Sequence, residues 1–167
     1  MIVMRQGEQE QVVYRQRDVT DVDYGSMWET LHQRQQHLLG CVREQGRLCM
    51  TAMPDHDALP SARWRTAQAA RHRMDYLMTT VLPVIETRCS QIELRQVAAL
   101  RDGTPSYQRW VTAFIAKWPG ERVFEDWPTY QIESEVFRTT IVKRVGQEAS
   151  VIRPILRRLE ISAVSGQ

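Results

Sequence analysis

The stretch SMWETLHQRQQHLLGCVREQG, residues 26–46, decides the fold class of this 167-residue chain. Its apolar side chains recur every three or four positions, at Trp28, Leu31, Leu38, Leu39 and Val42. This spacing places side chains on one face of an α-helix. Ser26 and Glu29 match the S-x-x-E capping box, and Gly46 is a typical C-terminal stop. The pattern predicts an amphipathic helix over residues 27–45.

A second helical pattern follows a loop that is marked by Pro and Asp over residues 54–60. It starts after Ser61, a potential cap. Apolar side chains then recur every three or four residues, with little interruption, as far as Ala99. Pro83 lies inside it, and an interior proline removes one helical hydrogen bond. We therefore expect a kinked long helix, or two helices joined near residues 79–83.

The strongest helix-boundary signal in the sequence is DGTPSYQRW, residues 102–110. Gly103 predicts the end of one helix, and Thr104 and Pro105 predict the cap and first position of the next. That next helix spans 105–118 and closes at Pro119-Gly120. Residues 121–128 are expected to form a connection with a strand-like piece.

The last helical pattern starts at Thr129 and runs to Leu159. Gly146 and Pro154 predict a break or bend in it. The sum is an all-α fold, a single bundle of about five or six helices over residues 25–161. Residues 1–24 are expected to form an irregular N-terminal arm, extended or partly disordered, and residues 162–167 a frayed end.

Bulk properties narrow the class of protein. No apolar run approaches the roughly 18–20 residues of a membrane span, and the N-terminus lacks the pattern of a secretory signal. We therefore expect a cytoplasmic protein without membrane contact. Cys41, Cys49 and Cys89 make an odd count, which favours free thiols over a disulfide framework.

Arginine dominates the basic residues but does not form one patch. The net charge is only +2, and the pI of 8.6 lies below the value of about 9 that is typical of nucleic-acid-binding domains. All basic residues except Lys117 and Lys143 are arginine, a chain-wide bias that a GC-rich bacterial or phage genome would explain. In residues 61–74 the arginines spread round the helix, with Arg65 outward and Arg73 on the flank. An alternative interpretation is a phosphate-binding face made of Arg65, Arg73, Lys143, Arg153, Arg157 and Arg158.

No catalytic or metal motif stands out. His37 and Cys41 are one helical turn apart and could share a metal with Cys49, but a structural zinc site needs four ligands, and CxxC and HExxH are missing. The chain has no GxSxG elbow, Walker A loop or GxGxxG. Glu133 and Glu135 point apart on a helix and indicate a solvated surface. We expect neither a metal, nor a cofactor, nor catalysis.

The aromatic residues suggest how such a protein would act. Trp28, Trp64 and Trp110 lie on apolar faces and are expected in the core. Trp127 stands between Asp126 and Pro128 in a connection, so it is harder to bury and could form a partner surface with Phe124. Val13 and Tyr14 of the arm are further candidate partner contacts.

The leading hypothesis is a non-enzymatic protein–protein interaction module, such as an accessory subunit, an adaptor or a chaperone-like factor. The alternative is a nucleic-acid-associated helical subunit that contacts phosphates through its arginines. A small-ligand binder or an enzyme without a recognisable motif comes third.

Overall fold

The computed structural model describes residues 22–165, and within them the chain forms helices and no β-strand. The α-helices are α1 (Tyr24–Cys49), α2 (Ala58–Tyr76), α3 (Leu82–Glu86), α4 (Gln91–Lys117), α5 (Gly120–Glu125) and α6 (Trp127–Ser165). A π-helical segment, η1 (Leu77–Val81), joins α2 to α3. The prediction of an all-α bundle is confirmed.

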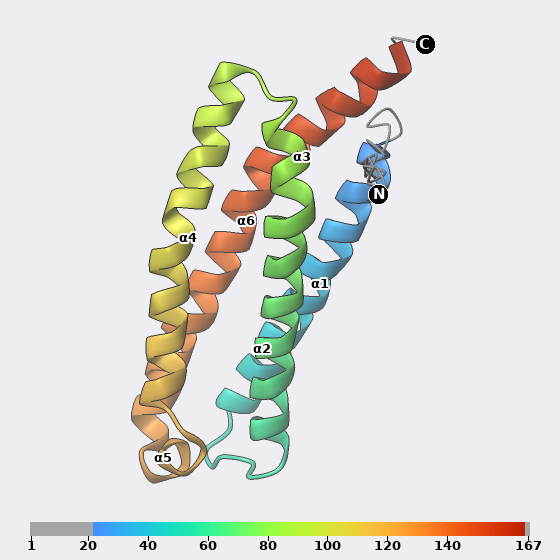
Figure 1. Ribbon diagram of the computed structural model, residues 1–167. Helices are drawn as coiled ribbons and strands as arrows, with labels where there is room; N and C mark the ends of the chain where they lie inside the picture. Colours follow the sequence, from blue (N-terminus) through green and yellow to red (C-terminus); the bar gives the residue numbers. More distant parts are fainter. Residues whose placement is uncertain (1–21, 166–167) are drawn as a thin grey trace, which may run out of the picture.

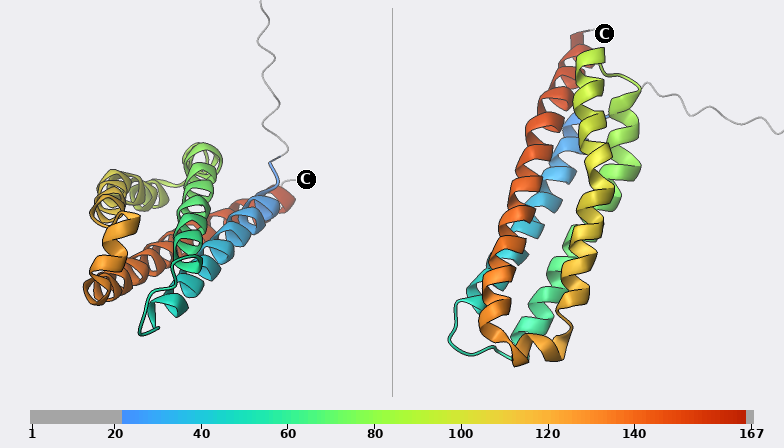
Figure 2. Two further views of the ribbon diagram at one scale, coloured as in Figure 1. Left: turned by 90° about the horizontal axis from the view of Figure 1, so that it is seen from below. Right: turned by 90° about the vertical axis from the view of Figure 1, so that its left-hand side faces the viewer.

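The long helices run alternately up and down the bundle (Figure 1). The passes are made, in chain order, by α1, by the column of α2, η1 and α3, by α4 and by α6. The short α5 turns the chain at one end. α1 packs on both α2 and α6, and α6 also packs on α4. Figure 2 shows that α4 and the α2–α3 column stand apart on the same side of α6. This arrangement leaves α2 and α4 facing one another.

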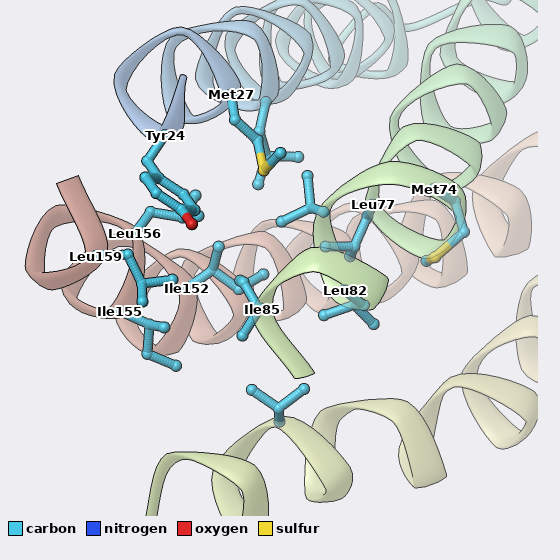
Figure 3. Packing of buried hydrophobic residues seen from close by; sticks show 13 residues of the cluster. Tyr24, Met27, Met74, Leu77, Leu82, Ile85, Ile152, Ile155, Leu156 and Leu159 are labelled. Atoms are coloured by element: carbon cyan, nitrogen blue, oxygen red, sulfur yellow. The ribbon is translucent and has the colours of Figure 1, made fainter. Parts of the chain in front are cut away.

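The buried apolar side chains form three clusters along the bundle. The largest joins α1, η1, α3 and the last third of α6, with Leu31, Val81, Ile85 and Ile152 almost fully buried. Figure 3 shows its side chains converging between these helices. The middle cluster contains Leu38, Val42, Ala69, Phe137, Ile141 and Val145. The third lies at the α5 end and contains Leu48, Leu59, Trp118, Val123, Trp127 and Tyr130. Each fully buried Leu or Ile side chain stabilises the fold by about 1.5–3 kcal/mol.

α1 is longer at both ends than predicted. Its cap is Asp23, whose Oδ1 accepts from the Ser26 backbone N–H at 2.9 Å, so Ser26 lies inside the first turn. Gly46 does not stop the helix, which continues to Cys49. A Cβ at Gly46 would lie 3.2 Å from Arg138 Nε, so this glycine makes room for a side chain of α6.

α2 begins before the predicted cap at Ser61. The carboxylate of Asp55 accepts from the backbone N–H groups of Asp57 and Ala58, at 3.0 and 2.8 Å, and so caps the start of α2. Near 79–83, where a kink or a junction of two helices is predicted, the structure has the π-helical segment η1, in which the Leu82 N–H donates to Leu77 O. Pro83 follows at once and has no N–H to continue an α-helical ladder.

The true break between the second and third long helices was missed. It lies at residues 87–90, where Ser90 caps α4 and forms a capping box with Glu93. The Ser90 N–H donates to Glu93 Oε2 at 2.8 Å, and the Glu93 N–H donates to Ser90 Oγ at 3.4 Å.

The predicted boundary at Gly103, Thr104 and Pro105 is wrong, because α4 runs through it. Arg144 of α6 supports the backbone there. Its Nη2 donates to Leu100 O at 2.7 Å and to Thr104 Oγ1 at 3.0 Å. A Cβ at Gly103 would lie 3.2 Å from Arg144 Nη1, so this glycine admits the guanidinium rather than ending a helix.

The predictions for the last part of the chain are wrong in four details. Residues 120–125 form α5 rather than a strand-like connection, and α6 starts at Trp127 rather than Thr129. α6 passes through Gly146 and Pro154 without interruption, because its buried stripe packs along its length and tertiary packing outweighs local propensity. Residues 162–165 are helical rather than frayed. Residues 166–167 and most of the predicted arm lie outside the described part of the chain.

Candidate functional site

A groove of about 650 Å³ lies between α2 and α4. Its walls are α2 from Pro60 to Asp75 and α4 from Tyr107 to Ile115, and Phe137 and Ile141 of α6 contribute to its floor. The walls exist because α2 and α4 both lean on other helices instead of packing closely on each other. The groove is therefore a built-in feature of the bundle's topology.

The groove is lined mainly by apolar side chains. Phe114 of α4 stacks on Phe137 of α6, with ring centroids 4.0 Å apart. Ala67 and Ala70 on α2 and Val111 on α4 are small, which leaves the space open. An apolar guest would therefore find a pre-formed aromatic and aliphatic surface.

Two large apolar side chains of the groove remain exposed to solvent. Trp64 on α2 is 64% exposed, and Ile115 on α4 is 48% exposed. Both line the groove from opposite walls. Tryptophan is highly buried on average in folded proteins, and it is among the residues most enriched at binding hot spots.

The prediction that Trp64 belongs to the core is wrong. The buried residues of α2 are Leu59, Ala62, Thr66, Ala69, Arg73 and Met74. Apart from Met74, they form a narrow stripe with a three–four spacing, and Trp64 points away from it. Thr66 and Arg73 interrupt the stripe in the sequence, so the apolar periodicity favoured the neighbouring face.

A buried charge cluster lies beside the groove. Arg73, which lines the groove, is 1% exposed and pairs through Nη1 with Oε2 of Glu148, which is fully buried. Glu148 also accepts from Arg144 Nε at 2.6 Å. One carboxylate therefore serves two guanidinium groups. The sequence-based orientation of Arg73, on the flank of its helix and facing solvent, is wrong.

Tyr107 lies on the opposite wall, close to the same cluster. The Arg144 guanidinium is 5.6 Å from the centre of its ring. Burial raises the pKa of the Tyr107 hydroxyl, on which Arg73, Glu148 and Arg144 also act electrostatically. The phenol therefore stays protonated and can donate a hydrogen bond.

The remaining charged groups of the groove are mostly positive. Arg63 donates to Trp118 O and lies 5.4 Å from the centre of the Tyr130 ring. Arg71 lies 3.8 Å from the carboxylate of Asp75, and both side chains are exposed. Among the lining residues three arginines, at positions 63, 71 and 73, face one acid, Asp75.

Phe124 and Trp127, which are predicted to form a partner surface, both pack against other residues of the chain. Trp127 is only 6% exposed and donates from Nε1 to Thr51 O at 3.2 Å. The expectation that it is hard to bury is wrong, because α6 begins at Trp127 and carries it into the cluster at the α5 end. Phe124 is half-buried and stacks on His56 at 4.0 Å. Val13 and Tyr14 lie outside the described residues.

The candidate phosphate-binding residues do not share one face. Arg65, Lys143 and Arg157 are exposed. Arg153 lies 5.7 Å from the centre of the Trp28 ring, and Arg158 pairs with Glu93 at 2.7 Å. Arg73 is buried, and the first half of α2, which carries Arg65, lies towards the opposite end of the bundle from residues 153–158 (Figure 1).

The candidate metal ligands separate as well. Cys41 Sγ lies 3.9 Å from His37 Nε2, whereas Cys49 is buried against Ser134 Oγ at 3.6 Å. Within residues 22–165 no group of three or more His, Cys, Asp or Glu side chains is placed to hold a metal ion.

Glu133, expected to be solvated, accepts from Lys117 Nζ at 2.5 Å and Trp118 Nε1 at 2.9 Å. No helix of residues 22–165 has the length and hydropathy to cross a bilayer.

Comparisons of the chain with protein-family models, with curated proteins and with solved structures found no match.

Proposed function

We propose that this chain is a non-enzymatic protein-interaction module, and that its α2–α4 groove receives an amphipathic helix of a partner protein. The observation that carries the proposal is the exposure of Trp64 and Ile115 on opposite walls of an apolar groove. A helix that laid its apolar face between the walls would remove both side chains from water.

The dimensions of the groove suit a helix. Its α2 wall extends from Pro60 to Asp75, a length of about 22 Å at 1.5 Å per helical residue. A guest helix of roughly four turns would match this wall. Because α2 and α4 run in opposite directions, the guest would lie between two antiparallel helices, as an added member of the bundle.

A helix fits these walls better than a small molecule does. Pockets for small ligands enclose about 70–90% of the ligand surface. Here Trp64 and Ile115 are 64% and 48% exposed, so only a guest that covers them from outside would remove them from water. We propose binding rather than catalysis because the ionised groups beside the groove, Arg73, Glu148 and Arg144, are engaged with one another.

Site-specific photocrosslinking tests the proposal. p-Benzoylphenylalanine is placed at position 64 in the full chain, or as a control at position 132, an exposed isoleucine on α6 that does not line the groove. Each protein is irradiated in a lysate of the source cells. The crosslinked protein is identified by mass spectrometry and then prepared in pure form.

The proposal expects position 64, and not position 132, to crosslink one protein through a segment that is helical in the complex. Adding Ile115→Lys should abolish the crosslink. A peptide of the crosslinked segment should bind the wild-type chain and lose at least tenfold in affinity for Trp64→Ala. Equal crosslinking at 64 and 132, or binding that ignores both substitutions, would refute the proposal.

A further inference from the structure

The charge cluster beside the groove is electrostatically unbalanced. Glu148 is shared by Arg73 and Arg144, so the cluster carries one more positive than negative charge. Arg144 has other acceptors, the Leu100 carbonyl and Thr104 Oγ1. The Nε of Arg73 has no hydrogen-bond partner among the described residues. A buried guanidinium with an unsatisfied donor is costly and calls for a physical reason.

The position of Arg73 supplies that reason. Arg73 lines the groove, as do Arg63 and Arg71, while Asp75 is the one acid among the lining residues. Tyr107, a neutral hydroxyl donor, faces the cluster from the other wall. The lining of the groove therefore carries an excess of positive charge. Complementary charge on the guest would raise both association rate and specificity.

We propose that the partner helix carries a carboxylate side chain, Asp or Glu, which the groove receives at Arg73 with the Tyr107 hydroxyl as a second donor. This inference rests on the proposed function and specifies the chemistry of the partner. The guest supplies the anion that the cluster lacks, and its neighbouring side chains cover the apolar floor.

The geometry of α2 also sets the spacing within the guest. Trp64 and Arg73 are nine residues apart on one helix, which is about 13 Å along its axis. On the other wall Ile115 and Tyr107 are eight residues apart, or about 12 Å. Trp64 and Ile115 thus lie towards one end of the groove, and Arg73 and Tyr107 towards the other. The guest is expected to carry its acid about two to three turns from the large apolar residue that contacts Trp64.

A display selection tests this pattern. A library of amphipathic 18-residue helices, randomised on one face, is selected on the full wild-type chain, with counter-selection on the Trp64→Ala/Ile115→Lys variant. The inference expects recovered peptides to be enriched in Asp or Glu at about two to three turns from a large apolar residue. A selected peptide and its Glu→Gln (or Asp→Asn) form are then compared by fluorescence anisotropy.

The comparison uses matched variants. On wild type, the acidic peptide should bind about tenfold more tightly than its amide form, the effect of one charge-assisted hydrogen bond. On Arg73→Met this ratio should fall to about one, whereas Arg65→Met, which removes an exposed arginine of α2 outside the groove, should keep it. Tyr107→Phe, which deletes only a hydroxyl, should reduce the acid-to-amide ratio severalfold. This variant replaces Arg73→Met as the test if Arg73→Met loses helical structure.

The outcomes separate the two proposals. Failure to recover any peptide whose binding depends on Trp64 and Ile115 would overturn the proposed function. Groove-dependent peptides without acidic enrichment, or an acid-to-amide ratio that Arg73→Met and Tyr107→Phe leave unchanged, would overturn the carboxylate inference alone.

Discussion

The sharing of Glu148 by two arginines predicts that the partners of this buried cluster respond unequally to substitution. Glu148→Leu leaves Arg73 buried without a counter-ion, since Arg73 is 1% exposed and Glu148 is its ionic partner in the structure. Breaking a buried pair in this way costs about 3–5 kcal/mol. Arg73→Met removes the other partner, but Glu148 keeps its bond to Arg144 at 2.6 Å. Its cost should be smaller, about 1.5–3 kcal/mol, the loss of one charged hydrogen bond.

The double variant Arg73→Met/Glu148→Leu provides the decisive comparison. It replaces the buried pair with apolar side chains, a change that is often neutral or stabilising. Arg144 is partly exposed and keeps its bonds to Leu100 O and Thr104 Oγ1. We expect the double variant to be at least about 2 kcal/mol more stable than Glu148→Leu, because no fully buried charge remains unpaired.

Urea denaturation monitored by circular dichroism measures these differences. With a slope of about 2 kcal/mol per molar urea, a loss of 4 kcal/mol would move the midpoint down by about 2 M. The reasoning would be refuted if Arg73→Met cost as much as Glu148→Leu. It would also be refuted if the double variant were no more stable than Glu148→Leu.

Three further predictions concern the packing and the helix ends. Trp127→Ala should lower the free energy of unfolding by about 3–5 kcal/mol because Trp127 is buried. Trp64→Ala should change this free energy by less than about 0.5 kcal/mol. Equal urea midpoints for the two variants would contradict the prediction. Gly146→Ala should raise the free energy of unfolding by about 1 kcal/mol, because a Cβ there meets nothing within 4 Å. Gly103→Ala should lower this free energy because its Cβ would displace Arg144. Stabilisation by both substitutions would contradict the prediction. The Arg158 guanidinium lowers the pKa of Glu93 to about 2, so this carboxylate stabilises the fold above its unfolded pKa of about 4.3, and that contribution should disappear as the pH falls towards 2. Arg158→Gln should therefore be less stable than wild type at pH 6, by up to about 1 kcal/mol, and the gap in thermal midpoint should narrow at low pH; a constant gap would argue against the pairing.

The sequence predicts the helical class well because the 3.6-residue period of apolar side chains is a local signal. Leu31, Leu38 and Val42 of α1, and Phe137, Ile141 and Val145 of α6, are on buried faces as expected. A change in the helix near Pro83 was also predictable, since proline acts on its own helix, and the structure has the π-helical η1 there.

The misplaced boundaries have tertiary causes that no local pattern contains. By sequence Gly46 and Gly103 predict helix ends, but in the structure each makes room for an arginine of α6, Arg138 and Arg144 respectively. Pro105 lies inside α4 although it leaves the carbonyl of Arg101 without its usual helical donor. A glycine that accommodates a distant side chain has the same sequence appearance as one that ends a helix.

The candidate groove was missed for a related reason. Its most informative residues are an arginine that is buried and a tryptophan that is exposed, the reverse of their ordinary tendencies. By ordinary tendency Arg73 would lie on the surface and Trp64 in the core, and this places the predicted buried face of α2 on the adjacent stripe. Only the position of Glu148, 75 residues further along the chain, shows why Arg73 faces inwards.

The long helix α6 also bears on how the protein acquires its structure during translation. It contributes to every core cluster, with Tyr130, Phe137 and Ile152 each at a different level of the bundle. A ribosome that has made α1 to α5 has therefore produced helices whose apolar faces still lack their common partner. Until residues 130–159 are synthesised the three clusters remain incomplete, so the core of the bundle closes only when α6 joins it.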